Sequence, residues 1–484
     1  MTRDALTALL LGIATSLTRL PFMAQRLWEW DSVLYARALE NGFHVEDALA
    51  GSRPHPPGYI FYVASAAVAR RAGLDSDHAL VLVSIVASGI GAIALYLLCR
   101  RLVGVVPAGL ITLAFAASPN FWLHGEVAIS YVLLAPLVTI LAMAFLWARS
   151  RGTVRSVFVS LLFGALAGFR QDVLLFLAPL WIWLLAPATT RERVAATAAL
   201  AAGCLTWFIP SALLSDGPTA YVASVWRQFA GLGVSAASPV SVAVSSVLIL
   251  DSLWWSLLAL GPVLLVLALA RALARLRGST AARDDQPGGI FFALWILPPL
   301  LFYLLVHIGE WGYVLSLVPG LFALLAWLLR PIIAATPRPW RVVGALLLAA
   351  NVLVGAGLFV LGDDPVFSAA SLSAHDRATD AKTQYLRDRL PASSTVVLAA
   401  VELLVARYYA PDRTILYSDD RATGTYTRAV PAGATLVVYE GHARPLDPPA
   451  FDTVEVAPGV KLEIGHASGT MLLLSGRAAD ELRQ

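Results

Sequence analysis

Residues 28–35 read WEWDSVLY and residues 55–59 read HPPGY, and both stretches lie in one polar segment, residues 23–71, between the first two apolar spans. A loop between membrane spans that concentrates carboxylates, aromatic side chains and a His-Pro-Pro turn is typical of a reaction centre rather than of a simple connector. Residues 31–40 have the spacing of an amphipathic helix, and residues 58–70 form a second apolar stretch that is too short to span. Both stretches could therefore lie in the membrane interface, separated by prolines that exclude continuous helix.

The composition predicts a polytopic membrane protein. Hydrophobic residues make up 58% of the chain, charged residues 14%, and the mean hydropathy is +0.71, whereas soluble domains are about half apolar and about a quarter charged. The net charge of +3 is too small to indicate a nucleic-acid partner. Cys99 and Cys204 fall inside apolar spans and therefore indicate no disulfide framework. Residues 1–21 are expected to remain as a first span, because no small-residue cleavage site follows them.

A helix needs about 20 mostly apolar residues to cross a bilayer. About eleven spans are predicted, at residues 5–22, 78–99, 104–119, 127–148, 156–170, 172–187, 194–214, 245–270, 289–306, 311–329 and 341–361. Arginines gather in five alternate loops, from Arg100 and Arg101 after the second span to Arg338 and Arg341 before the last. By the positive-inside rule these loops are cytoplasmic, so the N-terminus is expected inside and the C-terminus outside.

The hydropathy falls after residue 362, which predicts a membrane domain at 1–362, with a first outer loop at 23–77, and an extracytoplasmic domain at 363–484. In the second domain, residues 376–390 and 402–409 have the pattern of helices. Strands are predicted at 395–400, 414–417, 435–440, 453–457, 461–465 and 471–474. The fold class is therefore an α-helical polytopic membrane protein with a small C-terminal extracytoplasmic α/β domain.

Ionisable side chains at membrane depth are costly and are therefore candidates for function. Those on the predicted outer face come from separate segments: Asp31, His55, His124, Glu126, Arg170, Asp172, Arg227, His307 and Glu310. Several also have a structural explanation. Asp31 could cap a helix, and Glu126 could interact with a helix dipole. Arg170 could pair with Asp172, but the convergence of the whole set on one face favours function.

The residue types predict acid–base chemistry and anion binding. Asp31 is expected to act as general base towards an acceptor hydroxyl, and His55 either binds a phosphate oxygen or orients Asp31. Arg170 suits bidentate binding of phosphate, with Arg227 as a further cation. The remaining substrate-binding candidates are Tyr59, His307 and Glu310. Asp31 and Glu126 could also share a divalent cation through their carboxylate oxygens.

With these residues the chain resembles the GT-C integral-membrane glycosyltransferases, in particular the bacterial branch of the protein mannosyltransferase and aminoarabinose transferase type. The resemblance covers about the first 360 residues and rests on Asp31, HPPGY at 55–59, Glu126, GFRQD at 168–172, and His307 ahead of Gly312, Tyr313 and Pro319. It implies transfer of a sugar, with inversion, from a polyprenyl-phosphate-linked donor on the outer face of the bacterial inner membrane. The acceptor would be a lipid, a glycan or a protein of the cell envelope.

The resemblance also implies roles for two acids. Asp31 would be the base, and Glu126 matches the position of a second acid. Many members have an adjacent acidic pair, whereas here Ser32 follows Asp31. This difference leaves the use of a divalent cation open.

Two other functions are compatible with the sequence. A transporter or flippase for a lipid-linked glycan would also place arginines and carboxylates near a headgroup, but would show polar residues on both faces. A non-catalytic GT-C-like scaffold would have Asp31 pointing away from any cavity. Because the polar residues are predicted on one face, an enzyme is favoured.

Overall fold

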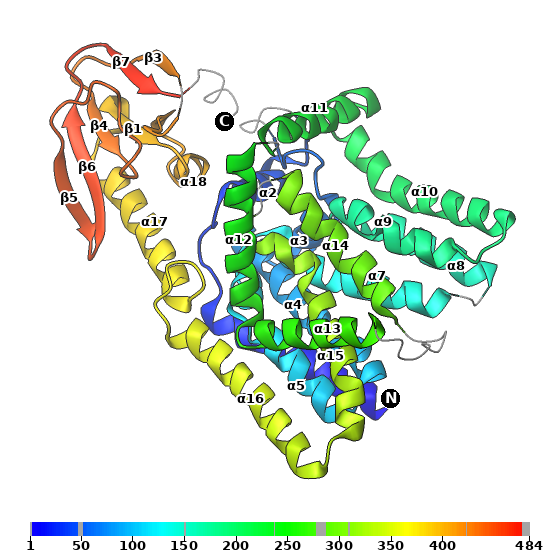
Figure 1. Cartoon of the computed structure of the whole chain (residues 1–484). Helices are drawn as coiled ribbons and strands as arrows, with labels where there is room; N and C mark the ends of the chain where they lie inside the picture. Colours follow the sequence, from blue (N-terminus) through cyan, green and yellow to red (C-terminus); the bar gives the residue numbers. More distant parts are fainter. Residues whose placement is uncertain are drawn as a thin grey trace.

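The computed structural model describes residues 2–46, 52–149, 152–236, 238–276, 287–307, 310–422 and 424–476. A helical bundle is followed by a smaller part that contains a sheet (Figure 1). The first helices of the bundle are α1 (Arg3–Arg19), α2 (Trp30–Asn41), α3 (Ile60–Arg71), α4 (Ser76–Leu102), α5 (Val105–Ala116), α6 (Pro119–His124), α7 (Leu134–Ala148), α8 (Thr153–Leu166) and α9 (Asp172–Leu185). The others are α10 (Thr190–Leu213), α11 (Pro218–Ala236), α12 (Pro239–Leu257), α13 (Leu260–Leu276), α14 (Gly289–Leu305), α15 (Val318–Ala335) and α16 (Arg338–Leu361). Short 3₁₀ turns are η1 (Leu20–Phe22), η2 (Ser130–Leu133) and η3 (Trp311–Ser316).

Apolar helices make the chain a multi-pass membrane protein, as predicted. Seven helical segments within the described residues are long and apolar enough to cross a bilayer: α1 with η1, α4, η2 with α7, α10, α12, α15 and α16. Five shorter apolar helices accompany them: α5, α8, α9, α13 and α14. A helix needs about 20 residues to cross a bilayer, and the seven long segments approach or exceed this length, whereas the five shorter helices do not.

The predicted span at 245–270 is wrong, because two helices occupy this stretch. The backbone of Leu258 adopts a φ of 48°, which ends α12 at Leu257, and α13 starts at Leu260. Figure 1 shows α13 running across the foot of α12 rather than continuing it. The sequence also left residues 215–244 without an element in front of that span, and α11 occupies most of this gap.

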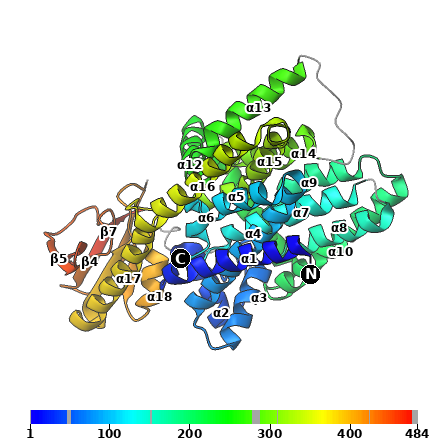
Figure 2. The same ribbon diagram turned by 90° about the horizontal axis from the view of Figure 1, so that it is seen from below.

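Helix α4 lies at the centre of the bundle, against α1, α3, α5, α7 and α15 (Figure 2). Small residues permit its close contact with α1. A Cβ atom added at Gly12 would lie 2.9 Å from the carbonyl oxygen of Gly89, and one added at Gly89 would lie 2.8 Å from that of Gly12. Such close approach of two backbones is the packing that small residues allow between membrane helices.

The C-terminal part is a small α/β unit. Its helices are α17 (Ala369–Arg389) and α18 (Leu403–Tyr409), with a 3₁₀ turn η4 (Ala392–Ser394). Its strands are β1 (Thr395–Ala399), β2 (Thr414–Tyr417), β3 (Thr425–Ala429), β4 (Thr435–Val438), β5 (Asp452–Ala457), β6 (Val460–His466) and β7 (Met471–Ser475). The strand order of the main sheet is β2-β1-β4-β6-β5, with β1 parallel to both of its neighbours. Strand β3, which the sequence pattern did not predict, pairs with β7.

Alternation along β1 explains how this sheet is covered. Val397 and Ala399 face a cluster that includes side chains of α17 and α18, whereas Val396 and Leu398 face one that includes β3 and β7. Successive side chains of a strand point to opposite faces, so a strand buried on both faces is apolar throughout. We propose to divide the chain at residues 362 and 363, next to the end of α16.

Candidate active site

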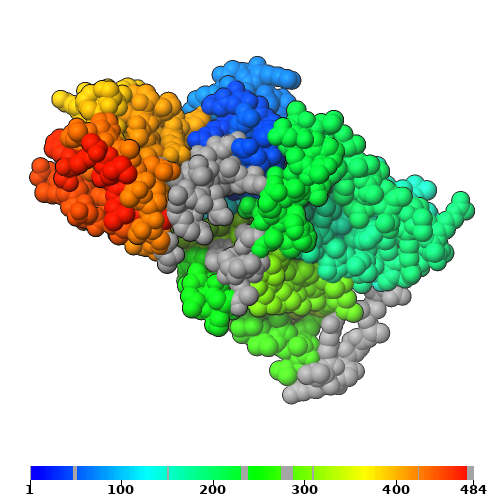
Figure 3. Space-filling model, turned by 90° about the horizontal axis from the view of Figure 1, so that it is seen from above, coloured from blue at the N-terminus to red at the C-terminus, as the bar shows by residue number. Residues whose placement is uncertain are grey.

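A cavity of about 560 Å³ opens where residues 29–34 of the first loop and α2 meet α9, α11, α14 and η3. The first loop, in blue, and the C-terminal part, in yellow to red, meet on the face seen in Figure 3. The candidates Asp31, His55, Tyr59, Arg170, His307 and Glu310 all line the cavity. Segments that are distant in the sequence therefore contribute to one space. The lining also includes Glu29, Trp30, Tyr131, Asp172, Phe229, Tyr303, Tyr313 and Val401.

Asp31 and His55 form an ion pair in the cavity wall. The Oδ1 atom of Asp31 lies 3.1 Å from Nε2 of His55, and the two side chains are 20% and 15% exposed. The other ring nitrogen, Nδ1, lies 2.6 Å from the carbonyl oxygen of Pro56, so an N–H there donates to that oxygen and turns Nε2 towards Asp31. The N-cap of α2 is Glu29. The carboxylate of Asp31 is therefore directed to His55 rather than used as the helix cap.

The surroundings favour the charged form of both groups. Burial by itself raises the pKa of Asp31, but the charge and hydrogen bond of His55, and then the charge of Arg170, outweigh burial and leave that pKa below its usual value. Burial likewise lowers the pKa of His55, but the charge and hydrogen bond of Asp31 reverse the effect and raise it. A carboxylate held in its charged form beside a cavity can accept a proton from a bound molecule.

Arg170 is a buried cation whose guanidinium group is fixed from several sides. It is 3% exposed, its Nη2 lies 2.7 Å from Oδ2 of Asp172, and its Nη1 donates to the hydroxyl of Ser130 at 2.9 Å. The guanidinium carbon also lies 4.9 Å from the ring centre of Tyr59 and 5.1 Å from that of Tyr131. The pairing of Arg170 with Asp172 that the sequence offered is present. It lies in the cavity wall, where a planar, fixed guanidinium can bind an anion.

Two further acids lie near Asp31. Glu310 was predicted as a site residue, whereas Glu29 was not. Glu29 and Glu310 line the same cavity. Burial, and then the negative charges of Asp31 and Glu310, raise the pKa of Glu29 well above its usual value. Burial and the charge of Asp31 also raise the pKa of Glu310. The acids near Asp31 are thus Glu29 and Glu310, and not a residue at position 32. The WEWD sequence at 28–31 was the signal that could have identified Glu29.

Glu126 was predicted as a partner of Asp31, but the fold places its side chain elsewhere. Glu126 is fully buried, accepts a hydrogen bond from the indole N–H of Trp122 at 2.6 Å, and interacts with the charge of Arg19 on α1. It is absent from the residues that line the cavity. The reason is electrostatic, since Arg19 is buried in the bundle and a buried charge requires a counter-charge.

The structure places Arg227 outside the cavity lining. Arg227 is exposed on α11 and is not among the residues that line the cavity, although Gln228 and Phe229 are. Among the residues described, no group of three or more His, Cys, Asp or Glu side chains is arranged to hold a metal ion. Glu126 does not line the cavity beside Asp31, and a cation shared by these two carboxylates stays a prediction.

The HPPGY turn fixes the position of His55 and Tyr59. Gly58 has a φ of 111°, which favours glycine, and Tyr59 follows with a φ of 47°. The carbonyl of Pro57 accepts a hydrogen bond from the hydroxyl of Tyr221 on α11 at 2.6 Å. The turn is therefore held between α11 and the start of α3.

Replacing Gly58 by alanine should lower the free energy of unfolding by about 1–3 kcal/mol. Alanine disfavours this φ, and its Cβ would lie 2.9 Å from side-chain atoms of both Phe43 and Val45. Thermal unfolding in detergent measures the effect. Gly344→Ala is the matched control, because Gly344 lies inside α16 with no atom within 4 Å of an added Cβ. Equal stability of the two variants would contradict the prediction.

Solved structures with a similar fold are known. No family model and no curated protein matches the sequence. The structure of ArnT from Cupriavidus metallidurans bound to undecaprenyl phosphate superposes with a TM-score of 0.54 at 12% identity, over 96% of this chain and 97% of that one. Its apo form has a TM-score of 0.52 at 13% identity over the same shares of the two chains.

A third structure, the apo oligosaccharyltransferase of Archaeoglobus fulgidus, has a TM-score of 0.49 at 13% identity, over 85% of this chain and 64% of that one. The two ArnT structures match nearly the whole of both chains. Because these matches cover 96% of this chain, they extend over the C-terminal strand-containing part as well as the bundle. The chain therefore has the fold of these ArnT structures.

Proposed function

We propose that this protein is a glycosyltransferase that moves a sugar from a polyprenyl-phosphate-linked donor to an acceptor at the outer face of a bacterial inner membrane. The observation that carries the proposal is the presence, in one cavity, of an ionised carboxylate, Asp31 beside His55, and of the buried guanidinium group of Arg170. The fold likeness to an ArnT structure that binds undecaprenyl phosphate supports the class of donor.

In the proposed reaction an acceptor hydroxyl attacks the anomeric carbon of the donor sugar. The bond from this carbon to the phosphate oxygen breaks as the new glycosidic bond forms, and the configuration inverts. Asp31 takes the proton of the acceptor hydroxyl, and polyprenyl phosphate leaves with its negative charge increased. Arg170 would stabilise that charge with charge-assisted hydrogen bonds, and His55 would hold Asp31 in place.

The position of the cavity supports an extracytoplasmic reaction with a cytoplasmic N-terminus. Helix α4 begins at Ser76, near the first loop, and its last turn carries Arg100 and Arg101 at the opposite end. The Nε of Arg100 lies 3.0 Å from Oδ1 of Asp4, near the start of α1. By the positive-inside rule the arginine-rich end faces the cytoplasm, so the cavity would face outward.

The use of a divalent cation in the transfer is tested separately. Glu29, Asp31 and Glu310 line the cavity with oxygen atoms of the kind that Mg²⁺ and Mn²⁺ prefer, although the described residues hold no preformed group of three ligands. Transfer should be measured after chelation with EDTA and again after addition of each metal. Recovery with metal would assign a cation to the reaction, whereas equal rates throughout would show that transfer needs no added cation.

Mass spectrometry of the cell envelope tests the function directly. Glycolipids and glycoproteins are compared between cells with the gene deleted and the same cells carrying the wild-type gene. We expect the deletion to lose one sugar modification and to accumulate its polyprenyl-phosphate donor. If the protein were a flippase, its deletion would instead leave the lipid-linked glycan on the cytoplasmic face. The accessibility of this glycan to added lectin measures that outcome. Identical glycans and donor levels in both strains would refute the proposal.

Replacing His55 by glutamine should move the acid limb of the pH–rate profile to higher pH. Asp31 acts as base in its charged form, so wild-type transfer is present above its lowered pKa and falls as the pH drops through that pKa. His55 is the largest of the favourable influences on this pKa, and its loss therefore raises it. Rates across the acidic range measure the shift, with exposed His466→Gln as the control. An unmoved acid limb would show that His55 does not set the pKa of the base.

A further inference from the structure

The segment of residues 23–29, between η1 and α2, obtains much of its backbone hydrogen bonding from the C-terminal part. The carboxylate of Asp376 accepts from the backbone N–H of Gln25 at 2.9 Å and of Arg26 at 3.0 Å. The hydroxyl of Tyr409 accepts from the N–H of Leu27 at 2.8 Å, and Nε2 of His375 lies 3.0 Å from the carbonyl oxygen of the same residue. Three successive amides are thus held by residues more than 340 positions away. Backbone groups outside regular structure need such partners.

The same part of the chain contacts both ends of α2, the helix that carries Asp31. At its start, the indole N–H of Trp30 donates to the carbonyl oxygen of Val401, in the turn before α18. Near its end, the hydroxyl of Tyr408 donates to Oε1 of Glu40 at 2.5 Å. Val401 also lines the cavity. The α18 region therefore fixes α2 on either side of Asp31.

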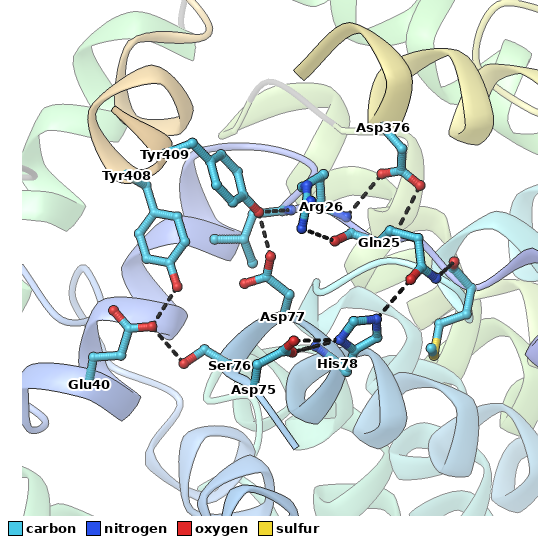
Figure 4. A network of polar contacts seen from close by, with 12 residues as sticks. Gln25, Arg26, Glu40, Asp75, Ser76, Asp77, His78, Asp376, Tyr408 and Tyr409 are labelled. Atoms are coloured by element: carbon cyan, nitrogen blue, oxygen red, sulfur yellow. Dashed lines mark hydrogen bonds and ion pairs between the residues drawn. The ribbon is translucent and has the colours of Figure 1, made fainter. Parts of the chain in front are cut away.

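Tyr409 connects three elements at one hydroxyl group, as Figure 4 shows. Besides accepting from Leu27, it donates to the carboxylate of Asp77 at the start of α4. The guanidinium carbon of Arg26 lies 5.5 Å from the centre of its ring, and Nε of Arg26 pairs with Asp380 at 2.5 Å. Helix α4 is the centre of the bundle. A single hydroxyl thus ties the segment before Asp31 both to the bundle and to the C-terminal part.

We propose that the C-terminal part holds the base in position, and that Tyr409 and Asp376 are positioning residues for Asp31. The inference rests on the proposed function, because it gives the contacts a role in sugar transfer. Asp31 follows Leu27 by four residues, so a shift of the held segment would pass to the first turn of α2. Misplacement of a reacting group by about 1 Å can slow a reaction about 100-fold.

The first experiment measures amide hydrogen exchange in the purified full-length protein and in Tyr409→Phe. The variant keeps the aromatic ring and loses only the hydroxyl. We expect exchange at residues 25–27 to rise by about tenfold, the effect of losing one hydrogen bond. Tyr385→Phe is the control, because Tyr385 lies on α17 and packs against the cluster on the sheet. Unchanged exchange in Tyr409→Phe would overturn the proposal.

The second experiment measures transfer kinetics with the same variants. We expect kcat to fall about tenfold in Tyr409→Phe while KM for the donor stays within about twofold, because the aromatic residues around Arg170 are untouched. A general loss of structure would raise KM and lower the thermal midpoint as well. Faster exchange with an unchanged kcat would overturn the positioning role. A wild type without sugar transfer would refute the proposed function instead, and the exchange rates would still decide whether the C-terminal part holds the segment.

Asp376→Asn repeats the test from a different side chain. The amide retains the size of the carboxylate but has one acceptor oxygen in place of two, so one of the hydrogen bonds from Gln25 and Arg26 is lost and the other loses its charge assistance. We expect the same pattern, faster exchange at residues 25–27 and a lower kcat at constant KM. The control is Asp388→Asn, an exposed carboxylate on the same helix. If Tyr409→Phe does not accumulate in membranes, Asp376→Asn decides the proposal, and wild-type values for it would overturn the inference.

Discussion

Asp31→Asn should reduce sugar transfer by about 10²–10⁴-fold, the usual contribution of a general base. Asparagine has the shape of aspartate but cannot take up the proton of the acceptor. His55 would still face position 31, because its other ring nitrogen remains tied to Pro56. The donor should bind as before, because Arg170 keeps its partners Asp172 and Ser130. We therefore expect the loss in kcat, with little change in KM.

Folding should survive the loss of this charge. When Asp31 is neutral, the strongest influence that raises the pKa of His55 is gone, and the imidazole becomes uncharged rather than remaining a buried cation. The thermal midpoint in detergent should therefore stay close to that of the wild type. Asp447→Asn is the matched control, since Asp447 is exposed in the C-terminal part. Wild-type transfer by Asp31→Asn would rule out Asp31 as the base.

Arg170→Gln should lower kcat/KM for the donor by about 10²–10³-fold, through both KM and kcat, because Arg170 binds the donor phosphate and stabilises the charge that this phosphate gains on leaving. The side chain offers the charge and the planar donor array that phosphate binding uses, and three tyrosine rings surround it. Arg170→Lys should recover only part of the loss, because an ammonium group keeps the charge but not the two-pronged geometry. Initial rates over a range of donor concentrations measure both effects.

Arg170→Gln has a second consequence, which must be separated from the first. It leaves Asp172 without its cation, and a broken buried pair costs about 3–5 kcal/mol, less here because Asp172 is 21% exposed. The double variant Arg170→Gln with Asp172→Asn restores a neutral pair and should regain most of the stability. Donor binding should remain weak in it. Arg227→Gln, outside the cavity lining, is the control for loss of a positive charge. Normal donor kinetics in the stable double variant would exclude Arg170 as the phosphate ligand.

The sequence was most informative where structure depends on neighbouring residues. Apolar length predicted α4, α10, α16 and most of the other spans, and the amphipathic pattern at 31–40 predicted α2 within one residue at each end. The prediction failed at residues 245–270, where a single residue in an unusual backbone conformation divides two apolar helices. Hydropathy cannot register such a break, because both sides of it are equally apolar.

The sequence predicted which residues belong to the candidate site better than it predicted which of their side chains interact. That Asp31, His55 and Arg170 lie together follows from loops that emerge on the same side of the bundle. Glu126 also lies in such a loop, but the buried charge of Arg19 on α1 draws it away from Asp31. Which of two nearby carboxylates meets a given cation depends on helix packing, and no spacing in the sequence encodes it.

The sequence by itself determined a membrane bundle, a small α/β part and a set of polar residues on one face, because hydropathy and periodicity are local properties. Only the tertiary structure decided which residues share the cavity and what holds them there. Glu29 becomes a neighbour of Glu310, and Tyr409 reaches the backbone of Leu27 from far along the chain. These contacts arise because buried charges and unpaired backbone groups must find partners wherever packing brings them close.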